Sequence, residues 1–133
     1  MIVWINGTHG AGKTTTSALV RQLLPDSRVF DAEKVSETLM TVLVEEYWRE
    51  ISAGLDQHAI PVRHFVLHAD QDTLRARIAG DTVVGPDSWF RLKYLEPYAE
   101  ASRAWLHDAA EVVDTTHRTP AEAAELIAES VKR

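Results

Sequence analysis

The segment Gly7–Thr14 matches the pattern G-x-x-x-x-G-K-[ST] in full. This pattern constrains the fold because its mechanism needs a strand before the glycine-rich loop and a helix after it. Both are predicted here. Ile2–Ile5 is a short apolar run typical of a buried strand, and the apolar residues of Thr14–Leu24 are spaced as on a helix. The sequence therefore predicts a strand, a phosphate-binding loop and a helix in that order.

The residue types of this loop indicate its chemistry. Glycines let the backbone turn its N–H groups inward, which makes an anion site at a helix N-terminus. We expect Lys13 to reach the β- and γ-phosphates of ATP, Thr14 to bind Mg²⁺ through its hydroxyl and Thr15 to contact the α-phosphate. His9 either contacts the ligand or fills the loop, and a glycine-rich turn without a ligand is the alternative for the whole segment. The predicted ligand-binding residues are Gly7, Thr8, His9, Gly10, Ala11, Gly12, Lys13, Thr14 and Thr15.

Strands and helices alternate along the rest of the chain. This order favours a parallel sheet with helices on both faces, the three-layer α/β/α arrangement of P-loop NTPases. With 133 residues the chain has room for one domain, residues 1–133. Further strands are predicted at Arg28–Asp31, Val62–Ala69 and Glu111–Asp114. Further helices are predicted at Glu33–Leu55, at Asp70–Ile78, at Ser88–Ala110 with a break at Pro97, and after Thr119, where Pro120 and Glu122 give a start signal.

Charge and composition argue against several classes of protein. The chain has 20 acidic and 14 basic residues, a net charge of −6, which argues against nonspecific nucleic-acid binding. It has no cysteine, and therefore no disulfide, thiolate metal site or thiol nucleophile. Its apolar runs are too short to span a bilayer, so we expect no transmembrane segment and a cytoplasmic location. A guanine-reading [NT]-K-x-D segment and an L-S-G-G-Q-like run are both absent from the sequence, which disfavours a GTPase switch and a transporter ATPase.

Asp31 is the candidate general base. It ends a predicted strand, and the ligands of open α/β sheets collect at the carboxyl ends of strands. A carboxylate there accepts the proton of a substrate hydroxyl or holds Mg²⁺ through water. Capping the helix predicted from Ala32 onward is an equally good alternative for this residue.

Arg77 and Arg91 are the candidates for neutralising a transferring phosphoryl group. They flank the segment 80–87 together with Arg75 and Lys93, and phosphoryl transfer needs cations around the equatorial oxygens. The alternative is that these side chains only solvate the faces of their helices.

Two histidines, His64 and His68, share one face of a predicted strand because an even number of residues separates them. No third ligand lies near them in the sequence, so a zinc site is disfavoured.

With these residues the chain resembles the small P-loop kinases and, more narrowly, the tunicamycin-resistance ATP-binding proteins. Its start, Met1–Gly7 running into Gly10–Thr14, and the segment Phe30–Lys34 are similar to the first two motifs of that family. Further similar stretches are Thr41–Val44, Tyr47–Trp48, His64–Leu67, Leu74, Arg77 and Val112–Thr115 before Thr119–Pro120. The resemblance touches most of the chain, and only the phosphate loop is highly specific.

The resemblance implies ATP and Mg²⁺ as cofactors and an association with resistance to tunicamycin or a similar nucleoside antibiotic. Two functions stay open. One is an ATP-dependent phosphotransferase that acts on a small hydroxyl-bearing molecule, with Lys13, Asp31 and either Arg77 or Arg91 as catalytic residues. The other is a nucleotide-dependent binding protein that sequesters the antibiotic without chemistry.

One departure from the family concerns the segment after the second predicted strand. Kinases of this kind carry more residues there, and Thr41–Val44 is β-branched, which suits a strand end better than the middle of a helix. A sheet built on Ile2–Ile5 also requires strands on both sides. We therefore expect residues to be missing around Leu39–Thr41.

Overall fold

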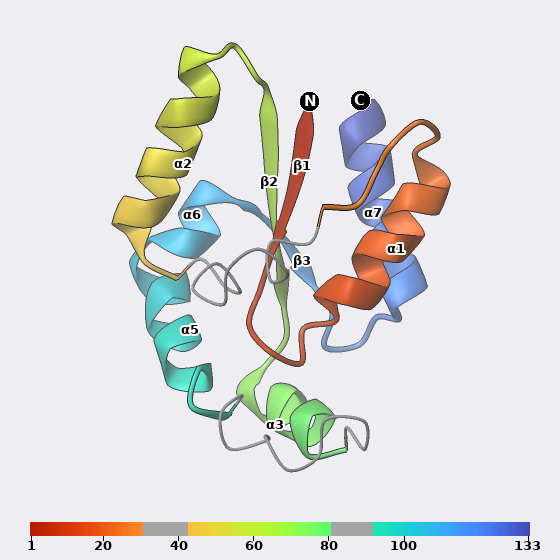
Figure 1. The fold of residues 1–133 in the computed structure, drawn as a ribbon. Helices are drawn as coiled ribbons and strands as arrows, with labels where there is room; N and C mark the ends of the chain where they lie inside the picture. The colour runs from red at the N-terminus through yellow and green to blue at the C-terminus, as the bar shows by residue number, and fades with distance from the viewer. Residues whose placement is uncertain (31–42, 81–91) are drawn as a thin grey trace.

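The computed structural model describes residues 1–30, 43–80 and 92–133, and within them three parallel strands form one sheet. The strands are β1 (Ile2–Asn6), β2 (Val62–His68) and β3 (Glu111–Asp114), with β2 in the middle. The register pairs Asn6 with Val66 and His68 with Asp114. Because all the strands run the same way, their carboxyl ends meet at one edge of the sheet (Figure 1).

Helices lie on both sides of this sheet, as the sequence predicts. Figure 1 shows α1 (Lys13–Leu23) and α7 (Pro120–Lys132) on one side, and α2 (Glu45–Gln57), α5 (Leu95–Ala101) and α6 (His107–Ala109) on the other. A π-helical turn, η4 (Ser102–Leu106), joins α5 to α6. The remaining described helix, α3 (Gln71–Ala79), lies beyond the carboxyl ends of the strands. None of the helices in the described residues has the length and hydropathy that crossing a membrane requires.

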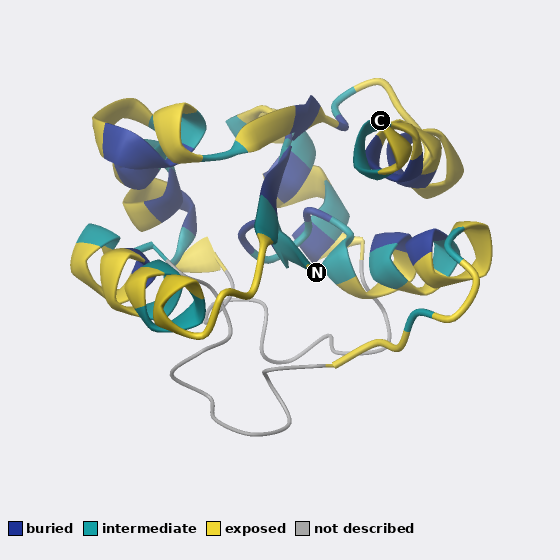
Figure 2. Ribbon diagram, turned by 90° about the horizontal axis from the view of Figure 1, so that it is seen from above, coloured by how far each residue is buried: buried dark blue, intermediate teal, exposed yellow. Residues whose placement is uncertain are grey.

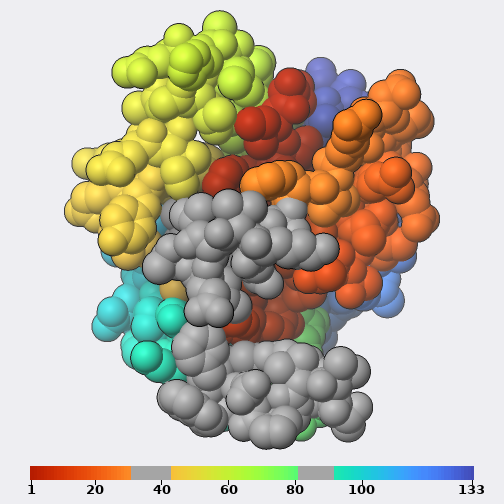
Figure 3. All heavy atoms as spheres, viewed as in Figure 1, coloured from red at the N-terminus to blue at the C-terminus, as the bar shows by residue number. Residues whose placement is uncertain are grey.

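The core lies where the sheet meets the inward faces of the helices (Figure 2). β2 is its centre, because Phe65, Val66 and Leu67 are almost completely buried. Helix α7 buries a face of small residues together with Ile127, which lets it pack closely against α1. At the outer edge, the start of the chain reaches the surface between α2 and the segment that follows α1 (Figure 3).

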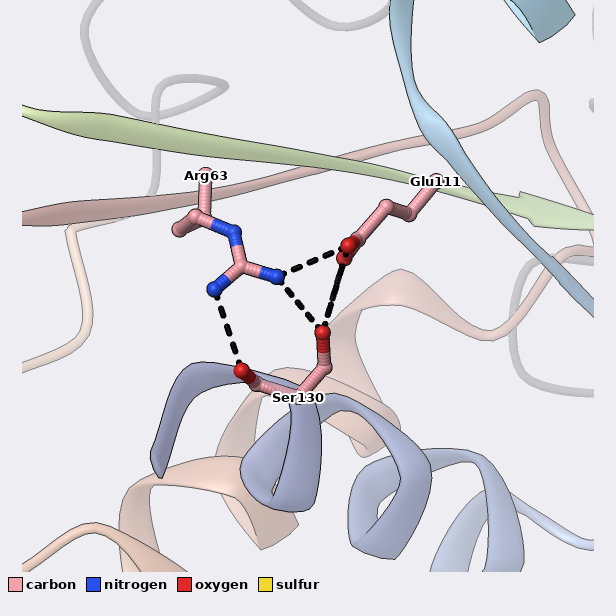
Figure 4. A network of polar contacts seen from close by, with 3 residues as sticks. All are labelled: Arg63, Glu111 and Ser130. Atoms are coloured by element: carbon pink, nitrogen blue, oxygen red, sulfur yellow. Dashed lines mark hydrogen bonds and ion pairs between the residues drawn. The ribbon is translucent and has the colours of Figure 1, made fainter. Parts of the chain in front are cut away.

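A network of hydrogen bonds and an ion pair joins α7 to β2 and β3 (Figure 4). Arg63 of β2 donates to the carbonyl oxygen of Ser130 at 3.0 Å and to its hydroxyl oxygen at 2.6 Å. The same guanidinium pairs with the carboxylate of Glu111, on β3, at 2.8 Å. One side chain thus joins β2, β3 and the last helix.

The predicted helix caps are confirmed. The hydroxyl oxygen of Thr119 accepts from the N–H of Glu122 at 3.2 Å, and the carboxylate of Glu122 accepts from the N–H of Thr119 at 3.3 Å, which completes a capping box. At the start of α3, the carboxylate of Asp70 accepts from the N–H of Thr73 at 2.7 Å. Hydrogen bonding to Thr73 holds the pKa of the Asp70 carboxyl below its usual value.

The predicted strand at Arg28–Asp31 is wrong over the residues that the structure describes. Residues 28–30 form no strand, and Phe30 is 78% exposed. A strand needs a neighbour for its backbone N–H and C=O groups, which the sequence pattern alone does not supply. Asp31 itself lies outside the described residues.

The helix predicted over Glu33–Leu55 is not continuous. Residue Val44 is extended, with φ −97° and ψ 118°, and α2 begins only at Glu45. A β-branched residue favours this extended backbone, and the acidic Glu45 and Glu46 stabilise a helix start there. Residues 31–42, and with them the gap expected around Leu39–Thr41, lie outside the described residues.

The helix predicted over Ser88–Ala110 is broken close to Pro97, as expected, because a turn at Lys93 and Tyr94 precedes α5, which begins only at Leu95. Pro97 lies in the first turn of α5, where a backbone N–H has no partner within the helix and a proline therefore costs little. A second departure from α-helical geometry follows at the π-helical turn Ser102–Leu106.

Candidate functional site

The predicted phosphate-binding loop Gly7–Thr14, called the phosphate loop below, lies at the carboxyl edge of the sheet, between β1 and α1 (Figure 1). Gly7 leaves β1 with its N–H donating to the side-chain oxygen of Asn6 at 2.9 Å. A Cβ atom at Gly7 would lie 3.0 Å from the carbonyl oxygen of Leu67 on β2. Only a glycine therefore fits where the loop passes the end of the central strand.

Helix α1 begins without a side-chain cap. Gly12 precedes it in the left-handed region, with φ 89°, and the N–H of Thr16 donates to the carbonyl of Gly12 at 2.9 Å. The N–H groups of the first turn have no carbonyl one turn earlier, and they carry the positive end of the helix dipole. An uncapped helix start behind a glycine turn has the polarity that a phosphate group requires.

Lys13 lies across the loop rather than in solvent. Its ammonium group donates to the carbonyl oxygens of Gly7 at 2.8 Å and Thr8 at 3.2 Å. The carbonyl oxygens of the loop therefore hold the ammonium in place. The position keeps the charge beside the start of α1, where the sequence predicts phosphates.

The threonines of the motif differ in their exposure. Thr14 and Thr15 are exposed in the first turn of α1, as a Mg²⁺ ligand and a phosphate contact must be. Thr8 is 1% exposed, and its hydroxyl has no hydrogen-bond partner among the described residues. No group of three or more His, Asp or Glu side chains that could hold a metal occurs in the described residues. Among the described residues, Thr14 is the predicted ligand for a magnesium ion at this loop.

His9 connects the loop to the helices on the other side of the sheet. Its ring centroid lies 5.5 Å from that of Tyr94, which directly precedes α5. The ammonium of Lys93 lies 5.9 Å from the centroid of the same tyrosine ring.

Arg77 is bound to the phosphate loop through backbone atoms. Its guanidinium donates to the carbonyl oxygen of Gly10 at 3.3 Å, and to the hydroxyl and carbonyl oxygens of Thr115 at 3.0 and 2.6 Å. The predicted cation thus lies beside the loop, where it joins α3 to the segment that follows β3. The other predicted arginine, Arg91, lies outside the described residues, as does the predicted base Asp31.

Thr115 also fastens the ends of β2 and β3 together. Its N–H and its hydroxyl both donate to the carbonyl oxygen of His68, at 2.6 and 3.0 Å. The neighbouring Asp114 accepts from the N–H of Thr116 at 2.9 Å, which holds the pKa of that carboxyl below its usual value. Hydrogen bonds from Thr115 to His68 therefore hold the ends of β2 and β3 together beside the loop.

A cluster of His68, Tyr98 and His107 was not predicted. The phenol oxygen of Tyr98 lies 2.8 Å from Nδ1 of His68 and 3.5 Å from Nε2 of His107. The two imidazole rings meet edge to face, with centroids 4.9 Å apart. The face on which His68 lies follows from strand alternation, but nothing in the sequence pairs that residue with Tyr98, 30 positions away.

His64 lies on the same face of β2 as His68 and is buried. Its ring lies 4.0 Å from the ring of Trp48 on α2, and Trp48 in turn contacts Trp4 of β1. Burial lowers the pKa of His64 to about 4, with the backbone of Ala109 opposing the shift. This histidine is therefore a neutral part of the core.

Comparisons with known proteins relate the chain to a solved structure. No protein-family model matches the chain, and no curated protein matches it significantly. Among solved structures, the tunicamycin resistance protein of Deinococcus radiodurans superposes with a TM-score of 0.74 at 22% sequence identity. The match covers 98% of this chain and 94% of that one, so the two chains share their fold along nearly their whole length.

Proposed function

We propose that the protein binds ATP with Mg²⁺ on the loop Gly7–Thr14 and transfers the γ-phosphoryl group to a hydroxyl of a small molecule. The observation that carries this proposal is the uncapped start of α1, behind the full motif and with the Lys13 ammonium beside it. A helix start of this kind is a ready anion site, and the glycine turn before it lets the backbone approach the phosphates.

The proposal gives roles to residues at the loop and to residues elsewhere in the chain. Lys13 exchanges its carbonyl partners for β- and γ-phosphate oxygens, while Thr14 supplies a hydroxyl to Mg²⁺ and Thr15 contacts the α-phosphate. Bound Mg²⁺ supplies charge neutralisation between the β- and γ-phosphates. Asp31 accepts the proton of the acceptor hydroxyl, and either Arg77 or Arg91 supplies positive charge around the transferring group.

The acceptor is proposed from the shared fold and from the motifs. The matched structure is a tunicamycin resistance protein, so we take tunicamycin or a similar nucleoside antibiotic as the candidate acceptor and resistance as the outcome. A protein that binds nucleotide and sequesters the antibiotic without chemistry is the competing function.

Product analysis tests this proposal. The protein is incubated with MgATP and tunicamycin, and mass spectrometry is used to look for an antibiotic product heavier by one phosphoryl group. We expect that product with the parent and none with Lys13→Ala, whose ATP affinity, measured by calorimetry, should be lost while its thermal unfolding stays cooperative. Nucleotide and antibiotic binding without a product would favour sequestration. Equal ATP affinity of parent and variant would refute the proposal that the loop Gly7–Thr14 binds ATP.

A further inference from the structure

A cavity of about 460 Å³ opens at the carboxyl end of β2. It lies between the start of α3 and the segment from α5 to α6. His68, Tyr98 and His107 line it, together with the small side chains of Ala69 and Ala99. Its volume falls within the range of ~300–1,000 Å³ that small-molecule sites occupy.

The cavity shares the edge of the sheet with the phosphate loop. His68 directly follows Leu67, whose carbonyl oxygen would lie 3.0 Å from a Cβ atom at Gly7. On the opposite wall, the side-chain amide of Gln71 donates to the carbonyl of Leu95 at 3.2 Å, which ties α3 to the start of α5. Ligands of parallel α/β sheets bind at this edge.

Two polar groups that line the cavity have shifted pKa values. Burial raises the pKa of the Tyr98 phenol to about 12, so the phenol keeps its proton. Burial, and then the neighbouring His68, lower the pKa of His107. The charged side chains of Asp70 and Arg103 also line the cavity but are exposed. The cavity is therefore lined by aromatic side chains whose polar atoms can form hydrogen bonds.

We infer that this cavity binds the acceptor of the proposed reaction, and that the acceptor is a neutral ring compound whose hydroxyls hydrogen-bond to the cluster of His68, Tyr98 and His107. Aromatic rings cover the apolar face of such a ring, and a neutral compound forms hydrogen bonds with the phenol and the imidazoles without the cost of burying a charge of its own. The inference rests on the proposed function for the link to ATP, but binding to the cavity is measured without any nucleotide.

Histidine ring signals in NMR spectra test the inference. Glucose and uridine serve as probes, because both are neutral hydroxylated rings, and each is titrated to millimolar concentration. We expect at least one probe to shift the signals of His68 and His107 saturably while those of the exposed His58 and His117 stay in place. If neither probe shifts the two cavity histidines, the inference is wrong.

Two variants and one control variant test whether the probe binds in the cavity. Ala99→Phe fills the cavity from a partly exposed position on α5, and it should weaken probe binding by at least about tenfold. Its matched control is Ala104→Phe, which adds the same ring at an exposed position outside the lining residues and should leave binding unchanged. Tyr98→Phe keeps the ring, removes the hydroxyl and should weaken binding by about tenfold. Equal probe affinity of the parent and Ala99→Phe would overturn the inference.

Lys13→Ala separates this inference from the proposed function. It should bind the probe as the parent does while losing ATP. Probe binding by a parent protein that does not bind ATP would refute the proposed function and support the cavity as a site of its own. ATP binding by a parent in which neither probe reaches the cavity would overturn the inference and leave the proposed function standing.

Discussion

The guanidinium of Arg77 donates to the carbonyl oxygen of Gly10 at 3.3 Å, although the two residues are 67 positions apart. Helix α3 thereby holds the middle of the phosphate loop. The same guanidinium also binds Thr115 after β3, so one side chain fixes the loop against the edge of the sheet.

Removing this contact should loosen the loop. We expect Arg77→Ala to lower ATP affinity by about tenfold and to cost about 1–3 kcal/mol of stability, because two backbone carbonyls lose a charged donor. Calorimetric titration with ATP and urea unfolding measure the two effects. Arg75→Ala, an exposed arginine on the same helix, is the control and should change neither quantity.

The buried His64 should make stability depend on pH. Its pKa is about 4 in the folded protein and 6.5 as the ordinary value, so the unfolded chain binds more protons between these pH values. The contribution of His64 to stability is therefore complete above pH 6.5 and is lost as the pH falls towards 4, at up to about 1.4 kcal/mol per pH unit. Urea unfolding of His64→Phe should show a shallower slope over this range. His58→Phe, at an exposed position, should keep the slope of the parent.

The network around Arg63 should contribute more to stability than an exposed ion pair. Arg63→Met removes the donor that joins Ser130 and Glu111, and we expect it to cost about 1–2 kcal/mol in urea unfolding. Arg49 pairs with Glu45 on the surface of α2 and is 73% exposed, so Arg49→Met should cost less than about 0.5 kcal/mol. Similar losses for both variants would contradict this prediction.

Substitution by alanine should have opposite effects on the stability of the protein at Gly7 and at Gly54. At Gly7 the added methyl meets the carbonyl oxygen of Leu67 at 3.0 Å, so Gly7→Ala should destabilise the protein and weaken ATP binding. At Gly54, inside α2, a Cβ atom would meet nothing within 4 Å. Gly54→Ala should therefore stabilise the protein by about 0.5–1 kcal/mol, because alanine has less backbone freedom to lose in the unfolded chain. Thermal unfolding compares the two, and a stabilised Gly7→Ala would disprove the close approach.

The features that local chemistry determines could be predicted from the sequence. The capping box at Thr119 and the cap at Asp70 depend on residues three positions apart, and strand alternation places His64 and His68 on one face. The false strand at residues 28–30 shows the limit, because an apolar pair such as Val29 and Phe30 becomes a strand only beside a partner.

Contacts between distant segments could not be predicted. The sequence marks Arg77 as a cation near the loop, but its bonds to Gly10 and Thr115 depend on how α3 packs against the end of β3. The cluster around Tyr98 likewise forms only when α5 docks on β2. The roles of Asp31 and Arg91 stay predictions.

The bonds of Lys13 to the carbonyls of Gly7 and Thr8 have a consequence for selectivity among anions. An incoming anion competes with these carbonyls for the ammonium, so the net gain from each bond it replaces is the difference between old and new partners. A singly charged ion such as chloride offers one diffuse contact and gains little from that exchange. A polyphosphate chain replaces both carbonyls and bonds the start of α1 as well. The carbonyl oxygens of the loop thus compete with small, singly charged anions for the ammonium of Lys13.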